Sequence, residues 1–114
     1  MRVGLTIDAV GTRDEFNVIL DILKDYNIES TFFGNVNTEP EIFKLIKGNG
    51  HEIGSHTYSH TSSFSNISLW EKERDTRSGH LWLMDVLKEE FMDFEIKGFR
   101  MPFYNFDPDL PLIL

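Results

Sequence analysis

The feature that most restricts how this chain can fold is a repeated alternation of strand-like and helix-like segments. Apolar residues alternate with polar ones over residues 3–8, the period of a strand, and then recur at helical spacing over 16–23. The same pair of patterns returns over 30–46 and again over 51–87, and a last alternating segment covers 94–99. Strands joined by helices long enough to act as crossovers predict a parallel sheet and an α/β fold.

Capping-box sequences predict where the helices begin. A serine or threonine is followed three residues later by glutamate at three places: Thr12–Glu15, Thr38–Glu41 and Ser68–Glu71. The third helix is expected to run to about Glu90, and residues 107–109 begin a further helical stretch. On the third helix we expect Trp70 and Trp82 to pack in the core and the charged residues 71–77 to face solvent.

Composition removes several classes of function. The 114 residues suffice for one domain. Lysine and arginine number 11 against 19 aspartates and glutamates, so the net charge of −8 disfavours binding to nucleic acid or an anionic membrane. The absence of cysteine excludes disulfides, thiolate metal sites and cysteine nucleophiles. Neither a signal peptide nor a membrane-spanning run is recognisable, so we expect a cytoplasmic protein.

Polar residues that suit catalysis follow three of the expected strands. Asp8, the pair His56 and His60, and Arg100 each stand where a strand ends. Reactive groups of parallel α/β folds gather at the carboxyl ends of strands, so these side chains are expected to converge at one rim. On a helical turn the spacing of His56 and His60 would place both imidazoles on one face, able to share a metal. The alternative is that two surface histidines occur by chance in a polar loop.

Four segments together resemble a known family. Residues 5–8, 30–33, 50–60 and 99–103 read LTID, STFF, GHEIGSHTYSH and FRMPF. In this order and spacing they resemble the motifs of the NodB-type polysaccharide deacetylases, carbohydrate esterase family 4. The resemblance implies a partial (β/α) barrel of about four parallel strands with three to four helices. It also implies a metal-dependent hydrolase, commonly a zinc enzyme, that removes acetyl groups from N-acetylated amino sugars.

The resemblance also implies a role for each matching residue. His56 and His60 would be metal ligands, and Asp8 would be the general base that activates water. Arg100 would pair with this base, and the backbone N–H of Phe103 would help to bind the oxyanion.

The aromatic residues after the third motif are candidates for substrate contact. Phe103, Tyr104 and Phe106 could form a wall on which pyranose rings stack. They could equally cover the end of the barrel. We carry Tyr104 and Phe106 forward as candidate substrate-binding residues.

The chain departs from the family pattern at the metal site. Ala9 stands where the family has a metal-binding aspartate, and Val10 stands one residue further on. A methyl group cannot bind a cation, so a zinc ion is expected to be held weakly, by two imidazoles. The alternative is that Asp8 turns to the metal, in which case it is not available as a free base. Asp14 is a poor substitute because it lies in the first turn of a helix, where an acid favours the helix dipole.

Length is the second departure. A closed eight-stranded barrel takes roughly 200 to 250 residues, and residues 1–114 supply about four strands. The family's later motifs, which include the general-acid histidine, are not found, so we interpret 1–114 as an incomplete NodB-like domain with weak or no deacetylase activity. The alternative is a catalytically silent module that binds metal, glycan or another chain. A third alternative is a homo-oligomer in which two copies cover each other's open sheet edge.

Overall fold

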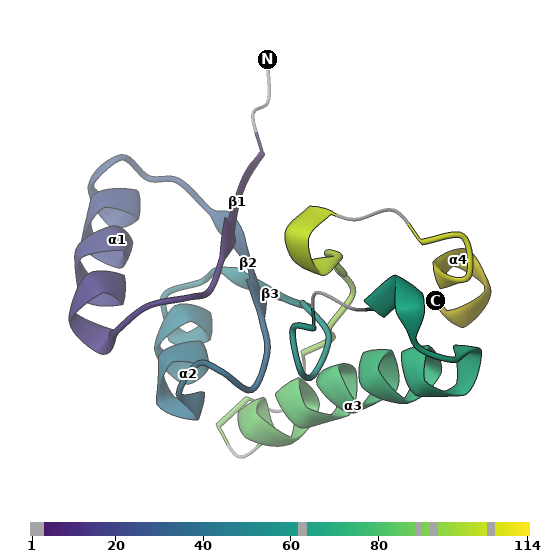
Figure 1. Ribbon diagram of the computed structural model, residues 1–114. Helices are drawn as coiled ribbons and strands as arrows, with labels where there is room; N and C mark the ends of the chain where they lie inside the picture. The colour runs from purple at the N-terminus through teal and green to yellow at the C-terminus, as the bar shows by residue number, and fades with distance from the viewer. Residues whose placement is uncertain (1–3, 62–63, 89, 92–93, 105–106) are drawn as a thin grey trace.

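The structure is a computed structural model that describes residues 4–61, 64–88, 90–91, 94–104 and 107–114. Strands and helices alternate along the chain as expected (Figure 1). In order, the elements are β1 (Leu5–Asp8), α1 (Arg13–Asp25), β2 (Ser30–Gly34), α2 (Pro40–Gly48), β3 (Glu52–Ser55), the 3₁₀ turn η1 (Phe64–Asn66), α3 (Leu69–Leu87), the 3₁₀ turn η2 (Pro102–Tyr104) and α4 (Leu110–Ile113).

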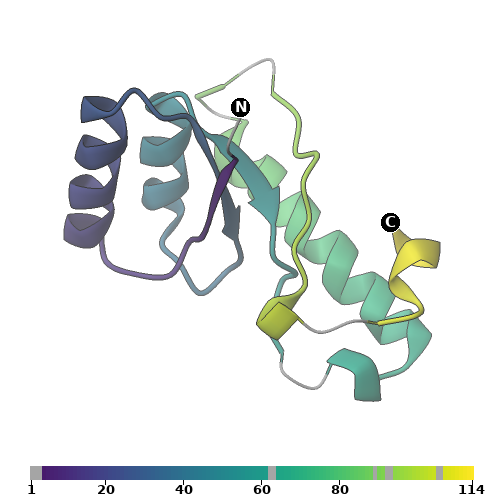
Figure 2. The same ribbon diagram turned by 90° about the horizontal axis from the view of Figure 1, so that it is seen from above.

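The three strands form one parallel sheet in the order β1-β2-β3. Ile7 lies opposite Phe32, and Phe32 lies opposite Ile53, so these three side chains form a row across one face. This face packs against α1, α2 and α3, which lie along one side of the sheet with α2 between the other two (Figures 1 and 2). On the other face Asp8 lies opposite Phe33.

The apolar core lies between the sheet and these helices. Phe32 is fully buried at its centre, and the side chains around it come from every helix of the layer. The buried members of this core are Ala9, Phe16, Leu20, Leu23, Phe32, Ile42, Phe43, Ile46, Ile53, Leu83, Leu87 and Ile96. The helical periodicities of the sequence therefore point into one common core, as a (β/α) arrangement requires.

The fourth expected strand is reduced to a single parallel bridge. Within the described part of the chain, the segment 94–99 pairs with β3 only through the bridge between Ser55 and Phe99. The Ser55 N–H donates to the carbonyl of Gly98 at 2.8 Å, and the Arg100 N–H donates to the carbonyl of Ser55 at 2.9 Å. These bonds still carry Arg100 to the carboxyl end of β3, which is what the site requires.

Two of the three capping boxes are confirmed and one is wrong. Thr12 and Ser68 each cap a helix, α1 and α3, in the reciprocal arrangement with the glutamate three residues on. Thr38 does not cap α2, because Pro40 begins that helix and the cap position falls on Glu39. The hydroxyl of Thr38 instead donates to the carbonyl of Ala9, so it joins the end of β1 to the start of α2. The third helix ends at Leu87, slightly earlier than expected.

The two tryptophans of α3 have different environments. Trp82 is half-buried and meets the Phe43 ring edge-on, with 5.7 Å between ring centres. Trp70 is 65% exposed, so the expectation that both tryptophans pack in the core is wrong for Trp70. None of the described helices is long and apolar enough to cross a membrane.

Lys72 departs from the expectation that residues 71–77 form a solvated face. Its side chain is buried, and its ammonium group lies 3.0 Å from a carboxylate oxygen of Asp107 and 2.7 Å from one of Asp109. Hydrogen bonds to Asp109 and Asp107 raise the pKa of Lys72. Burial opposes ionisation of Asp107, but its hydrogen bonds, that from Lys72 first among them, outweigh burial and lower the pKa of Asp107. The ion pairs thus attach the segment after η2 to α3.

Gly34 provides a test of the packing between β2 and α2. A Cβ atom at this position would lie 2.1 Å from Cε1 of the Phe43 ring, which is itself fully buried. We expect Gly34→Ala to lower the free energy of unfolding by about 1–3 kcal/mol, as over-packing of a core does. The measurement is urea denaturation. Gly4→Ala is the matched control, because no described residue beyond its chain neighbours has an atom within 4 Å of a Cβ there. Equal midpoints for both variants would contradict the packing described.

The Lys72–Asp107 pair predicts a pH dependence of stability. Because the folded-state pKa of Asp107 is lowered, its contribution is complete above the unfolded pKa of about 3.9 and is lost as pH falls through the folded value. In Lys72→Met the Asp107 carboxylate is buried without its ammonium partner. We therefore expect the melting temperatures of the two proteins to differ most at neutral pH and to converge below about pH 4. A difference that stays constant over this range would contradict the assignment.

Candidate functional site

The carboxyl ends of the strands bring together the four polar residues that the sequence singles out. Arg100 Nη1 lies 2.8 Å from Asp8 Oδ1. The other carboxylate oxygen, Asp8 Oδ2, lies 3.8 Å from His56 Nε2. His56 Nε2 in turn lies 3.0 Å from His60 Nε2. One guanidinium, one carboxylate and two imidazoles therefore form a continuous cluster at one rim of the sheet.

The environment of His56 fixes which of its ring nitrogens is available. His56 is buried, and its Nδ1 lies 2.7 Å from the backbone carbonyl of Arg100. A carbonyl only accepts hydrogen bonds, so Nδ1 carries the proton and Nε2 keeps its lone pair. Burial lowers the pKa of His56, which keeps the ring neutral. A neutral imidazole with a free Nε2 is the form that binds a metal.

A loop, not a helical turn, brings His60 to His56. Thr57 and His60 both have left-handed backbone conformations, with φ of 62° and 55°. The His60 N–H donates to the Thr57 hydroxyl at 3.1 Å, and this bond closes the loop. The expectation of a helical turn is wrong here, although the two imidazoles do meet.

Gly79 of α3 supports this loop, and the sequence interpretation did not identify it. A Cβ at Gly79 would lie 2.5 Å from the carbonyl carbon of Thr57, so only glycine lets the helix approach the loop backbone this closely. Thr57 is fully buried as a result. A glycine in a helix interior costs about 1 kcal/mol relative to alanine. Its presence there was the signal that could have revealed the contact.

Contacts with Asp8, Thr6 and Phe33 help to hold the Arg100 side chain in place. Besides the ion pair with Asp8, Arg100 Nη2 donates to the hydroxyl of Thr6, and its guanidinium lies 4.5 Å from the centre of the Phe33 ring. Thr6 and Phe33 were not identified from the sequence. The strand period could have revealed Thr6, because it lies on the same face of β1 as Asp8, two residues away.

Ala9 lies in the apolar core beside this cluster. It is 2% exposed, and its N–H donates to the carbonyl of Phe33 at 2.8 Å. Across the described residues, no group of three or more His, Cys, Asp or Glu side chains could hold a metal ion. Two nitrogens on one tetrahedral zinc lie about 3.3 Å apart, given Zn–N bonds of roughly 2.0–2.1 Å. The 3.0 Å between the Nε2 atoms of His56 and His60 is close to this value, so the pair fits as two ligands.

Of the aromatic residues after the third motif, Phe103 lies next to the histidines. Phe103 is 57% exposed, has a left-handed φ of 60°, and its ring centre lies 5.0 Å from that of His60. Tyr104 belongs to η2. Phe106 lies outside the described residues.

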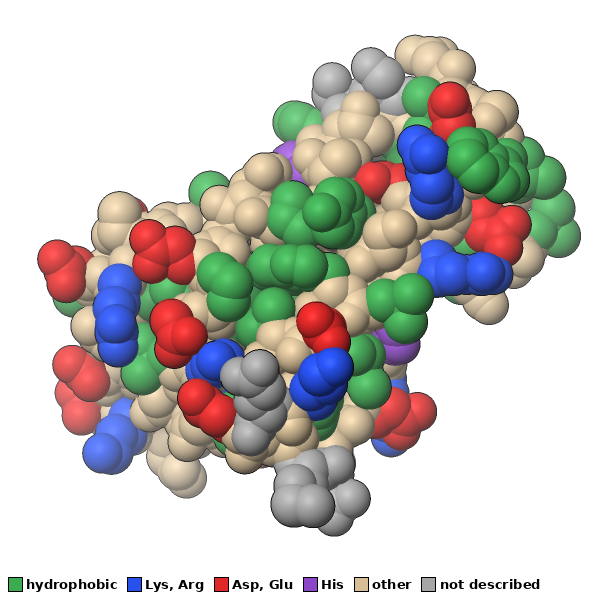
Figure 3. All heavy atoms as spheres, turned by 90° about the horizontal axis from the view of Figure 1, so that it is seen from below, with side chains coloured by type: hydrophobic (Ala, Val, Ile, Leu, Met, Phe, Trp, Pro, Cys, Tyr) green, Lys and Arg blue, Asp and Glu red, His purple; other side chains and the backbone are tan. Residues whose placement is uncertain are grey.

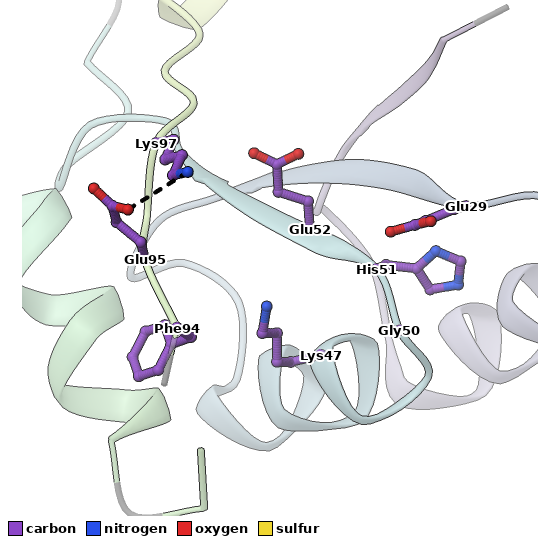
Figure 4. Close-up of a pocket in the computed structure, with 8 residues that line it drawn as sticks. All are labelled: Glu29, Lys47, Gly50, His51, Glu52, Phe94, Glu95 and Lys97. Carbon is purple, nitrogen blue, oxygen red and sulfur yellow. Dashed lines mark ion pairs between the residues drawn. The ribbon is translucent and has the colours of Figure 1, made fainter. Parts of the chain in front are cut away.

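A hollow of about 700 Å³ lies at the amino ends of β2 and β3, opposite to the ends that carry this cluster. Figure 4 shows the residues that line the hollow. Both carboxylates and ammonium groups line it, from Glu29, Lys47, Glu52, Glu95 and Lys97, and Gly50, His51 and Phe94 complete its wall. His51 is buried, and its Nδ1 accepts the N–H of Ser30 at 3.1 Å. Burial lowers the pKa of His51, so this histidine joins two strand starts as a neutral acceptor.

Comparisons with known proteins relate the whole arrangement to one family. The family model described as polysaccharide deacetylase matches residues 1–113. A peptidoglycan-N-acetylglucosamine deacetylase from Bacillus cereus is 44% identical over 62 residues, which cover 52% of this chain and 22% of that protein. A chitin deacetylase from Colletotrichum lindemuthianum is 38% identical over 50 residues, 37% of this chain and 20% of that protein. The chain thus matches about a fifth of the length of these two relatives.

Solved structures agree with the fold. A protein from Bacillus anthracis, BA3943, described as a CE4 family pseudoenzyme, superposes with a TM-score of 0.84 at 23% identity and covers 96% of this chain and 38% of its own. The peptidoglycan deacetylase PdaC from Bacillus subtilis superposes with a TM-score of 0.79 at 24% identity, covering 96% of this chain and 52% of its own. The expected NodB-type (β/α) fold class is therefore confirmed. Since the family model matches nearly every residue, the chain belongs to the polysaccharide deacetylase family.

Proposed function

We propose that this chain carries the metal-binding and base residues of a hydrolase that removes N-acetyl groups from amino sugars, and that its own activity is weak. The observation that supports this most directly is that the two oxygens of the Asp8 carboxylate have different neighbours. Arg100 binds Oδ1 at 2.8 Å, while Oδ2 lies 3.8 Å from His56 Nε2. One oxygen is anchored, and the other is directed toward the imidazoles.

Each residue of the cluster has a chemical task in this proposal. His56 and His60 would hold a divalent metal, with zinc the ion that suits two imidazoles. The bound metal would supply a water of lowered pKa and a polarised acetyl carbonyl. Asp8 Oδ2 accepts a proton from water, and Arg100, which binds Oδ1, orients the carboxylate. The backbone N–H of Phe103 donates to the oxyanion of the tetrahedral intermediate.

The names of the relatives and the chemistry of the cluster support the proposed substrate class. Relatives are named for peptidoglycan N-acetylglucosamine and for chitin, which share N-acetylated amino sugars. The exposed ring of Phe103, 5.0 Å from His60, offers an apolar surface for one sugar face. We place Tyr104 and Phe106 in the same substrate-binding role.

Two features underlie the weak activity. Ala9 presents a buried methyl group where the family has an aspartate ligand, which leaves two imidazoles for the metal. The family's general-acid histidine has no counterpart in these 114 residues. We therefore regard 1–114 as an incomplete deacetylase domain.

The second candidate function is a catalytically silent module that binds metal, glycan or another protein chain. Burial of the Ala9 side chain in the apolar core favours the silent module, because this side chain contributes to packing and not to metal binding. Metal affinity and acetate release together separate the two candidates.

Restoring the acid tests the ligand position. We expect Ala9→Asp to tighten zinc binding by more than the roughly 10- to 100-fold typical of changes around a metal's direct ligands. Without zinc, the same variant should melt at a lower temperature than the wild type, because it buries a carboxylate. Zinc should then restore the melting temperature. Calorimetric titration and thermal melts with and without zinc measure both effects.

Gly4→Asp is the matched control for charge. It adds the same carboxylate at an exposed position where, apart from the chain neighbours, the described part of the chain has no atom within 4 Å of a Cβ. Equal zinc affinity of Ala9→Asp and Gly4→Asp would show that position 9 does not face the metal, and the proposed ligand geometry would be wrong.

Activity is the second test. We expect little or no acetate release from chitin oligomers by the 114-residue chain with added zinc, since loss of general acid–base help alone costs roughly 10²- to 10⁴-fold in rate. Any residual release should disappear in Asp8→Asn and persist in Asp14→Asn, whose carboxylate lies on α1. Release near the rate of a complete family member, abolished by Asp8→Asn, would show that the metal and the acid are supplied in another way.

A further inference from the structure

The loop that carries His60 contains two residues in a backbone conformation that L side chains rarely adopt. Thr57 and His60 both lie in the left-handed region, with φ of 62° and 55°. Such a conformation persists only where the surrounding structure restrains it. The bond from the His60 N–H to the Thr57 hydroxyl lies within the loop and does not attach it to the rest of the molecule. Contacts from outside the loop must therefore hold it.

Asp75 of α3 binds both of the residues that stand between Thr57 and His60. Its backbone carbonyl accepts the Tyr58 N–H at 3.1 Å, and its carboxylate oxygen Oδ1 accepts the Ser59 N–H at 3.2 Å. The second bond is made by the side chain, so it depends on the identity of residue 75. One aspartate thus connects the middle of the loop to a helix of the core layer.

The carboxylate of Asp75 is not placed as a solvated surface group. Acidic and basic side chains are interspersed on the surface seen from the side of α3 (Figure 3). Asp75 Oδ2, by contrast, is buried, and no described residue forms a hydrogen bond with it. Burial of part of a carboxylate costs free energy unless another contact compensates for it. Like Lys72, Asp75 therefore departs from the solvated face expected for residues 71–77.

We propose that Asp75 is a positioning residue for the two imidazoles: by holding residues 58 and 59, it keeps His60 within reach of His56. The ring centres of the two histidines lie 4.6 Å apart, and their Nε2 atoms lie 3.0 Å apart. The consequence for metal binding rests on the proposed function. The arrangement of the two rings does not.

His56 does not depend on Asp75 in the same way. Its N–H donates to the carbonyl of Gly34 at 2.9 Å, and its Nδ1 lies 2.7 Å from the carbonyl of Arg100. The main chain of β2 and of the segment after Gly98 thus fixes this histidine. Loss of the Asp75 side chain is therefore expected to displace His60 relative to a fixed His56.

Three variants test the proposal. Asp75→Ala removes the acceptor of the Ser59 N–H, and because Ser59 is exposed, water can satisfy this donor while the loop loses its restraint. Asp75→Asn is the rescue variant, since its amide oxygen accepts an N–H without carrying a charge. Asp85→Ala is the matched control, because it removes an exposed aspartate of the same helix, one that pairs with Lys88. Circular dichroism establishes that each variant is folded. Asp75→Ser, whose shorter side chain cannot reach the Ser59 N–H, replaces Asp75→Ala if that variant is not.

The first measurement is NMR spectroscopy of the metal-free chain. We expect Asp75→Ala to weaken the nuclear Overhauser contacts between the His56 and His60 rings and to speed hydrogen exchange of the Ser59 amide. Asp75→Asn and Asp85→Ala should resemble the wild type. The second measurement is calorimetric titration with zinc. Asp75→Ala should bind zinc roughly 10- to 100-fold more weakly, as is typical when a residue that orients metal ligands is lost, and Asp75→Asn should recover most of the affinity.

Unchanged ring contacts in Asp75→Ala, or an equal loss in Asp85→Ala, would overturn the proposal. So would an Asp75→Asn variant that binds zinc as weakly as Asp75→Ala, because the charge of Asp75 and not its hydrogen bond would then be responsible. A wild type that binds no zinc would overturn the proposed function. The ring contacts of the metal-free chain would still decide the role of Asp75.

Discussion

The parallel register of three short strands is the constraint on which the rest of the structure depends. Side chains alternate along a strand. The pairing of Ile7 with Phe32 and of Asp8 with Phe33 therefore assigns each side chain of β1 and β2 to one of the two faces of the sheet. One face is covered by helices and forms the core. The other face keeps Asp8 beside Arg100. A shift by one residue would bury the carboxylate and expose the core, so the apolar face and the site are fixed together.

Much of this arrangement could be predicted from the sequence, because it depends on period and spacing. The alternation of strands and helices, two of the three capping boxes and the family all follow from local patterns. The rest depends on contacts between distant residues. Pro40 moves the start of α2 and frees Thr38 to bond Ala9. Likewise, Gly79 in the interior of α3 signals a close approach, but nothing local indicates that its partner would be Thr57.

The alternation of side chains along β1 also separates the candidate site from the apolar core. Asp8 lies on the polar face, and the next residue, Ala9, enters the apolar core with the helices of the layer. The candidate site and the core are thus consecutive along β1 and its continuation. Thr38 and Phe33 bind the main chain of Ala9, so its backbone is held whichever side chain it carries. Substitution of the side chain there therefore requires no other path of the backbone.

The hydrogen bond between His56 Nδ1 and the carbonyl of Arg100 has a consequence for how mutational data would be interpreted. Position 100 contributes twice: its guanidinium binds Asp8, while its main chain sets the tautomer of His56. Truncating the side chain removes the first contribution and keeps the second. Side-chain substitutions at position 100 would therefore detect the contribution of the guanidinium and not that of the main chain. The tautomer of His56 depends on the position of a backbone carbonyl, which side-chain substitutions do not remove.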